Sequence, residues 1–203
     1  MAAGRVPPGA RELGLRSALN GVAGDSLAAV DSTLAVRMEL RAGGAALALT
    51  RASLAGLRPR VCVFIHGLAC DELSWNRRAA AWQGSAWAHR LRADQPLQYG
   101  ALLEHELGVS AVFLRYNTGL AIDTSAQQLA ALLGRVVQAA PQVREWLLIG
   151  HSMGGLVARR AHDIGVSTQL AWVRRAPMIV CLGSPHHGAP LAKVGALATA
   201  VLN

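Results

Sequence analysis

Four short apolar segments constrain the fold of this chain more than any other feature of its sequence. They are Val61–Ile65, Ala111–Leu114, Trp146–Ile149 and Met178–Leu182. A strand with one face in water alternates apolar and polar residues, whereas a strand buried on both faces is apolar almost throughout. The four segments therefore predict the strands of a mostly parallel sheet with helices covering its faces.

Helical patterns separate these segments. The expected helices span residues 12–30, Pro96–Leu107, Thr124–Ala140 and Met153–Ile164. Gly108 is expected to end the helix of Pro96–Leu107, and Gly165 to end the helix of Met153–Ile164. Thr124-x-x-Gln127 is a possible capping box at the start of the helix between them.

An antiparallel hairpin is expected before the first apolar segment. Apolar residues alternate from Leu34 to Leu49, and Gly43-Gly44 interrupts them as a turn would. A hairpin followed by alternating strands and helices predicts the α/β class. We divide the chain into an N-terminal arm and helix, residues 1–33, and an α/β domain, residues 34–203.

Composition excludes several classes of protein. A chain of 203 residues that is 52% hydrophobic has room for one domain with a sizeable core and is not disordered. No apolar stretch reaches the length of a membrane span, and the first residues lack the apolar core of a signal peptide, so a cytoplasmic location is expected. The net charge of +8 comes from scattered arginines and Lys193, without the clustering that a nucleic-acid site needs. Cys62, Cys70 and Cys181 form no C-x-x-C motif, and we interpret Cys62 and Cys181 as small core residues.

The segment Gly150–Gly155, with the sequence Gly-His-Ser-Met-Gly-Gly, carries the strongest chemical signal. It contains G-x-S-x-G between a predicted strand and a predicted helix, which is the setting of a nucleophile elbow. Small residues are needed there because the strand and the helix approach closely around the serine. We therefore predict that Ser152 is a nucleophile at a tight turn with its hydroxyl accessible.

A second signal is His66-Gly67-Leu68, directly after the first apolar segment. In a serine hydrolase of this topology, an oxyanion hole takes one backbone N–H from the residue after the nucleophile and one from the loop after an earlier strand. Those residues would be Met153 and Leu68. We predict that their amides converge near the Ser152 hydroxyl.

Two other patterns are weaker. Gly24-Asp25-Ser26-Leu27 spells the motif of another hydrolase family but lies in a helical pattern with no strand before it, so we interpret it as coincidence. Trp75, Trp82 and Trp87 lie where an acyl pocket would be walled, although ordinary packing explains them better.

The chain resembles bacterial α/β-hydrolases related to GPI inositol-deacylases and triacylglycerol lipases. Four blocks carry the resemblance, in the order of the family: Phe64–Leu68, Leu114–Gly119, Ile149–Val157 and Leu182–Pro190. The resemblance implies an α/β-hydrolase fold and hydrolysis of lipid or other carboxylic esters through an acyl-serine, with no cofactor or metal.

The chain departs from that family in its catalytic acid and base, which in this fold follow the nucleophile. After Ser152 the sole acidic residue is Asp163, and the histidines are His162, His186 and His187. Asp163 and His162 would lie about 15 Å along the helix from Ser152, facing away. The expected acid and base would therefore lie beyond residue 203, with the last strands of the fold missing, and the chain would resemble a truncated hydrolase. A non-catalytic scaffold and an acyltransferase are the alternatives.

Overall fold

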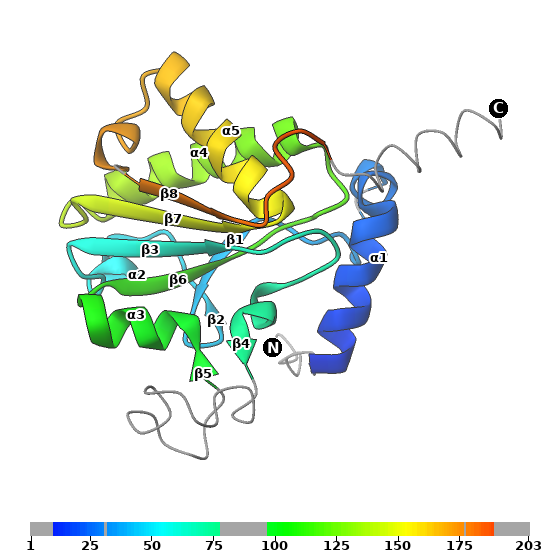
Figure 1. Cartoon of the computed structure of the whole chain (residues 1–203), viewed down its shortest axis with the longest axis horizontal. Helices are drawn as coiled ribbons and strands as arrows, with labels where there is room; N and C mark the ends of the chain where they lie inside the picture. The colour runs from blue at the N-terminus through cyan, green and yellow to red at the C-terminus, as the bar shows by residue number, and fades with distance from the viewer. Residues whose placement is uncertain (1–9, 31, 78–96, 177, 189–203) are drawn as a thin grey trace, which may run out of the picture.

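The computed structural model describes residues 10–30, 32–77, 97–176 and 178–188. A six-stranded sheet forms its centre (Figure 1), in the spatial order β2-β1-β6-β3-β7-β8. The strands are β1 (Glu39–Ala42), β2 (Ala45–Ala46), β3 (Arg60–Ile65), β6 (Ser110–Arg115), β7 (Glu145–His151) and β8 (Met178–Leu182). Strands β6, β3, β7 and β8 run parallel, while β1 is antiparallel to both β2 and β6. The predicted mixed, mostly parallel sheet is confirmed.

Strand β3 shows why these segments are continuously apolar. Val61, Val63 and Ile65 belong to a core cluster that includes residues of the helices on one face of the sheet. Cys62 and Phe64, which alternate with them, belong to a second cluster on the other face. Both faces are covered, so neither set of alternate side chains meets water.

The helices lie on both faces of the sheet and at one end of it (Figure 1). Helices α4 (Ile122–Ala139) and α5 (Met153–Ser167) cover one face, and α3 (Tyr99–Leu107) lies on the other. Helix α1 (Ala10–Ala29) lies across the end toward which the parallel strands point. The remaining elements are α2 (Arg51–Leu54), the 3-10 turns η1 (Glu72–Trp75) and η3 (Val173–Arg175), and a small sheet of β4 (Asn76–Arg77) and β5 (Leu97–Gln98). Within the described residues, no helix is both long and apolar enough to cross a membrane.

The hairpin and α3 largely match their predictions. Gly43 and Gly44 form the turn with φ of 55° and 80°, but the paired strands are shorter than the alternation suggested. Helix α3 begins at Tyr99 rather than at Pro96, because Leu97–Gln98 pair with β4. It ends as predicted at Gly108, whose φ is 62°.

Two predicted helix ends are wrong. Helix α4 begins at Ile122, so Thr124 is inside the helix and caps nothing; Gln127 instead donates to the Asp123 carboxylate at 2.9 Å. Helix α5 continues through Gly165 to Ser167. A β-carbon at Gly165 would come within 2.4 Å of the Val173 side chain, so this glycine serves close packing rather than helix termination.

His66 follows β3 directly and is completely buried. Its Nδ1 lies 3.0 Å from the Gly67 carbonyl oxygen, which only accepts, so Nδ1 donates and Nε2 carries the lone pair. Nε2 has no hydrogen-bond partner among the described residues. Burial lowers the pKa of this imidazole to about 4, so His66 is a neutral structural residue at neutral pH.

We expect His66 to make folding stability depend on pH between about 6.5 and 4. The unfolded chain binds a proton at His66 near its ordinary pKa of ~6.5, while the folded chain does not until about 4. The free energy of unfolding is therefore highest above pH ~6.5. It falls as the pH drops toward 4, by on the order of 3 kcal/mol. The free energy of unfolding, measured with urea at pH 7 and at pH 5, should differ less between the two pH values in His66→Asn than in the wild type. His105→Asn, at an exposed position, is the control, and an unchanged difference in His66→Asn would contradict this account.

Candidate active site

Ser152 occupies the turn between β7 and α5. Strand β7 ends at His151 and α5 begins at Met153, so one residue makes the whole connection. Its φ is 52° and its ψ is −122°, a backbone conformation that residues other than glycine rarely adopt. The Ser152 N–H donates to the Leu182 carbonyl of β8 at 2.8 Å, and the side chain is partly exposed. The strand–turn–helix geometry predicted for this motif is present.

Two glycines of the motif make the turn sterically feasible. A β-carbon at Gly150 would lie 2.3 Å from the Gly155 nitrogen, and one at Gly154 would lie 2.3 Å from the Ile65 carbonyl oxygen. Both distances are far below van der Waals contact, and both involve backbone that cannot rotate away. The first turn of α5 therefore touches β7 on one side and the end of β3 on the other.

The loop that follows β3 lies against the serine. A β-carbon at Gly67 would come within 3.1 Å of the Ser152 β-carbon and 3.3 Å of the His151 carbonyl oxygen. The next residue, Leu68, is 54% exposed, and Met153 is the first residue of α5. Among the described residues, no hydrogen-bond acceptor is found for either of these two amides. Their convergence on the Ser152 hydroxyl stays a prediction.

The polar side chains beyond the turn are paired elsewhere. Asp163 and Asp123 both accept from Arg160 on the exposed side of α4 and α5, and the His162 ring contacts Trp172. His186 accepts at Nδ1 from Arg159 at 3.0 Å, since a guanidinium can only donate. His187, next to it, is exposed. In the part of the chain that the structure describes, no hydrogen bond joins the Ser152 hydroxyl to a histidine.

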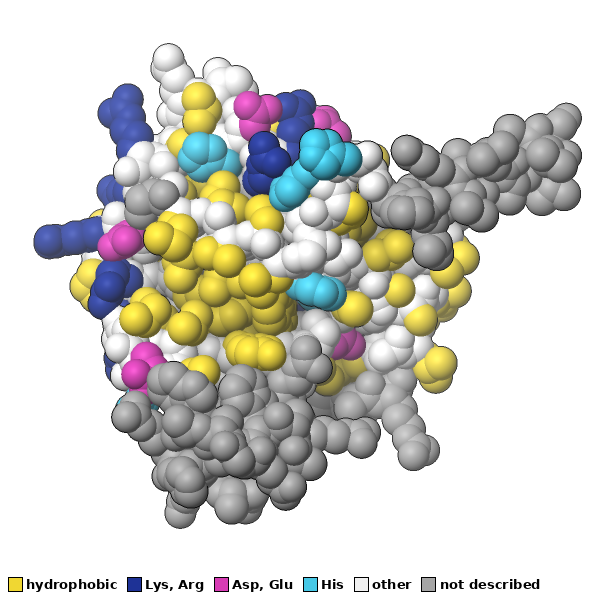
Figure 2. Space-filling view, viewed as in Figure 1, with side chains coloured by type: hydrophobic (Ala, Val, Ile, Leu, Met, Phe, Trp, Pro, Cys, Tyr) yellow, Lys and Arg dark blue, Asp and Glu magenta, His cyan; other side chains and the backbone are white. Residues whose placement is uncertain are grey.

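An apolar groove of about 380 Å³ opens beside the serine. His151, which precedes Ser152, and Leu182, whose carbonyl holds the Ser152 amide, both line it. Figure 2 shows hydrophobic side chains gathered over the sheet on this side of the molecule. The other lining residues are Phe64, Cys70, Ser74, Trp75, Tyr99, Leu102, Leu103, Ile149 and Val180.

Only part of this groove was predictable from the sequence. Trp75 is 5% exposed, so it packs as expected, against Phe64 with ring centroids 5.0 Å apart; it also forms part of the groove wall. Trp82 and Trp87 lie outside the described residues. Leu102 and Leu103 were missed, because their contribution depends on how α3 packs against β6 on this face of the sheet.

Of the two cysteines predicted to be core residues, Cys62 is in the core, whereas Cys181 is half-buried, with its Sγ 3.8 Å from the Gly155 carbonyl oxygen. Cys62 is fully buried, and burial raises the pKa of its thiol to about 12, which suppresses the reactive thiolate. Burial also raises the pKa of Cys70 in the groove wall, with a smaller contribution from the charge of Asp71. Within the described residues, no three His, Cys, Asp or Glu side chains are grouped as a metal site would require.

Two solved structures of one lipase show a partial likeness to this chain. Among solved structures, the Bacillus licheniformis lipase BlEst2 is similar in its mature form, with 21% identity and a TM-score of 0.45 over 70% of this chain. Its propeptide form gives 22% identity and a TM-score of 0.44 over 68% of this chain. The chain spans only 46% of the mature lipase and 25% of the propeptide form. No curated protein sequence matches this one.

The family model gives the assignment. The model described as the PGAP1-like alpha/beta domain matches residues 57–199, which include the elbow, the loop after β3 and all four parallel strands. That span is 143 of the 203 residues, well over half of the chain. The chain belongs to the family of PGAP1-like alpha/beta domains.

Proposed function

We propose that this chain hydrolyses carboxylic esters with Ser152 as the nucleophile. The observation that carries the proposal is the backbone of Ser152, held at φ 52° and ψ −122° between β7 and α5. Such a conformation costs roughly 1–3 kcal/mol, and residues held in this way are concentrated at functional sites. Glycine adopts a positive φ without this strain. If the residue served only to make the turn, glycine would therefore be favoured over serine at this position.

The proposed reaction is acyl transfer to water. The Ser152 Oγ attacks the ester carbonyl carbon and its proton passes to a base, while the carbonyl oxygen becomes an oxyanion. The Leu68 and Met153 amides donate to that oxyanion. The C–O bond to the alcohol then breaks, the alcohol takes up the proton, and an acyl-serine remains. Water attacks this ester in the same way and releases the acid.

We assign the base and the acid to no described residue. The Nδ1 lone pair of His186 is occupied by Arg159, and Asp163 is tied to Arg160 on the exposed side of α5. General-base catalysis typically contributes about 10²–10⁴-fold, so a serine without a base would react slowly with ordinary esters. A non-catalytic scaffold is the alternative, favoured by the missing bond between Ser152 and a histidine within the described residues.

We propose that the acyl chain of the substrate is apolar and binds in the groove beside Ser152. Its wall is formed by aliphatic and aromatic side chains, and two of its residues, His151 and Leu182, flank Ser152 directly. Burial of each methylene in such a groove is worth ~0.8 kcal/mol. A longer acyl chain would therefore bind more tightly until the groove is full.

The nucleophile is tested with Ser152→Ala. We expect the wild-type chain to turn over p-nitrophenyl butyrate weakly, at about 10³–10⁴ times the rate in water, as other serine hydrolases do without their triad. A fluorophosphonate should label one peptide, the one that contains Ser152, as measured by mass spectrometry. The label should disappear in Ser152→Ala and persist in Ser167→Ala, a matched change at the far end of α5.

Two results would contradict these expectations. Equal labelling of Ser152→Ala would exclude Ser152 as the nucleophile. Robust turnover that depends on Ser152 would mean that a base is already present, and His186 and His187 would be the first residues to replace.

The acyl groove is tested with Leu103→Trp, which places a large side chain in the groove from α3. In the wild type, kcat/KM should rise about fourfold per added methylene from acetate towards octanoate, the equivalent of ~0.8 kcal/mol. In Leu103→Trp the acetate ester should react normally, while esters of eight carbons or more should lose at least about tenfold in kcat/KM. Leu107→Trp, at the exposed end of the same helix, is the control. A chain-length profile unchanged in Leu103→Trp would show that the acyl group lies elsewhere.

A further inference from the structure

We propose that Arg115–Thr118, the segment that ends β6 and follows it, positions the oxyanion-hole amide of Leu68. The inference rests on the function proposed above, since it assigns a purpose to the loop of residues 66–72. The same segment lies in one of the sequence blocks that resemble the hydrolase family, and neither the nucleophile nor the groove accounts for it. None of its side chains needs to touch the substrate.

Two side chains hold the loop on either side of Leu68. The Tyr116 hydroxyl donates to the His66 carbonyl oxygen at 2.8 Å, and the two rings pack with centroids 4.6 Å apart. The Thr118 hydroxyl oxygen accepts from the Ala69 N–H at 3.0 Å. Tyr116 and Thr118 are 2% and 3% exposed, so water does not compete for either bond. The backbone is thus fixed two residues before Leu68 and one residue after it.

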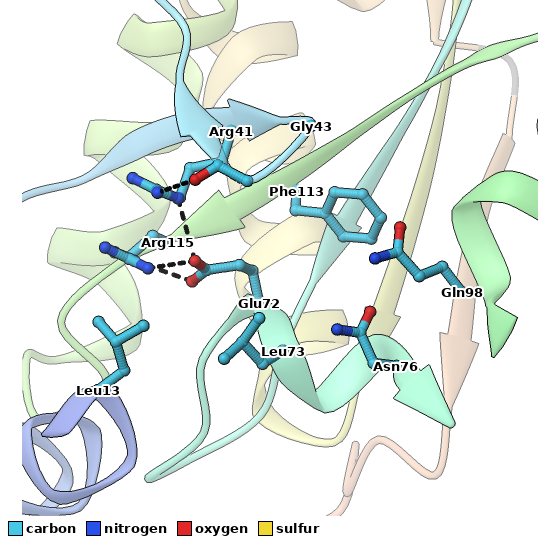
Figure 3. Close-up of a pocket in the computed structure, with 10 residues that line it drawn as sticks. Leu13, Arg41, Gly43, Glu72, Leu73, Asn76, Gln98, Phe113 and Arg115 are labelled. Carbon is cyan, nitrogen blue, oxygen red and sulfur yellow. Dashed lines mark hydrogen bonds and ion pairs between the residues drawn. The ribbon is translucent and has the colours of Figure 1, made fainter. Parts of the chain in front are cut away.

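A third contact holds the far end of the loop (Figure 3). The Arg115 guanidinium forms a two-pronged ion pair with the Glu72 carboxylate, with Nε to Oε2 at 2.8 Å, and the Arg41 Nε lies 3.0 Å from the same carboxylate. Burial alone would raise the pKa of Glu72, but the Arg115 hydrogen bond and the charges of Arg115 and Arg41 hold that pKa below its usual value. The carboxylate therefore stays ionised and bound near neutral pH.

Helix α1 closes the loop from the opposite side. Asn117 Nδ2 donates to the Gly24 carbonyl oxygen at 2.8 Å and so ties the segment to α1. A β-carbon at Gly21 of α1 would come within 2.8 Å of the Ala69 side chain, so the helix backbone rests directly on the loop. Segment and helix confine Ala69 between them.

This confinement is needed because Ala69 is strained. Its φ is 56°, a left-handed conformation that a residue with a β-carbon adopts only when its surroundings impose it. Without the Thr118 acceptor the Ala69 amide would lose its partner, and the backbone would relax toward negative φ. The peptide units on either side of Ala69 would rotate, and the Leu68 amide would move with them.

Small displacements of an oxyanion donor are costly. Such a donor acts at about 2.7–3.1 Å from the developing charge, and its complete removal lowers kcat about 10²–10³-fold. A misplacement of ~1 Å caused by a change outside the reacting groups can cost about 100-fold. Tyr116 and Thr118 are therefore positioning residues, whose loss should lower the rate of the chemical step rather than substrate binding.

The test is Thr118→Val, a change of similar shape that removes the hydroxyl. We expect the rate of phosphonylation of Ser152 and the kcat for p-nitrophenyl butyrate to fall about 10- to 100-fold, with KM nearly unchanged. Amide hydrogen exchange in a peptide covering residues 62–73, followed by mass spectrometry, should become faster. Thr118→Ser, which restores the acceptor, should recover most of the rate and slow the exchange again. Tyr116→Phe, which frees the His66 carbonyl, should lower kcat in the same way.

Thr168→Val is the matched control, because the Thr168 hydroxyl also bonds to a backbone group, the Ile164 carbonyl at the end of α5. It should alter neither exchange in the loop nor the rate at Ser152. Normal exchange in Thr118→Val, or faster exchange with an undiminished rate at Ser152, would overturn the positioning role while the proposed function stood. If Ser152 in the wild-type chain does not react at all, the proposed function is wrong and this inference falls with it.

Discussion

Contact between the first turn of α5 and the ends of β3 and β7 is the constraint on which the rest of this structure depends. It forces the chain to reverse at a single residue, and Ser152 takes the strained conformation that results. That strain costs roughly 1–3 kcal/mol. Trp146 and Leu148 of β7 and Val157 of α5, all fully buried on the two elements that this turn joins, are each worth about 1.5–3 kcal/mol by burial. The free energy gained by core packing exceeds the cost of the strain severalfold, so packing keeps Ser152 in its strained conformation.

The strands could be predicted because burial on both faces leaves a signature within each segment. All four apolar segments became parallel strands with boundaries within two residues. Helix ends were harder, since a glycine such as Gly165 can end a helix or admit a neighbouring side chain. Which of these occurs depends on Val173, and only the folded structure brings that residue alongside.

In the candidate site too, local features could be predicted from the sequence, while features built from distant segments could not. The turn at Ser152 was predictable, because its requirements for small residues are local and fall within six residues of sequence. The groove was not, because its wall is assembled from several separate segments of the chain. Nor was the use of Tyr116 and Thr118, whose bonds reach the backbone of His66 and Ala69 about fifty residues away and leave no periodic pattern. Sequence motifs pointed to the proposed nucleophile, whereas the structure shows which residues contact the backbone around it.

The central position of β3 has a consequence for how the chain is made. Its partners are distant in sequence: Val61 pairs with Ser110 of β6 and with Trp146 of β7. Non-local pairing of this kind slows folding, because the entropy of closing long loops is lost before the contacts form. At about 5–20 residues per second, a ribosome needs roughly 4–17 s to add the residues that separate the end of β3 from that of its β7 partner. During that interval Val61–Ile65, an apolar segment of high β-propensity, can pair with β6 at most and lacks its β7 partner. Such segments are prone to aggregate, so we expect the yield of folded protein to depend on synthesis rate as well as on final stability.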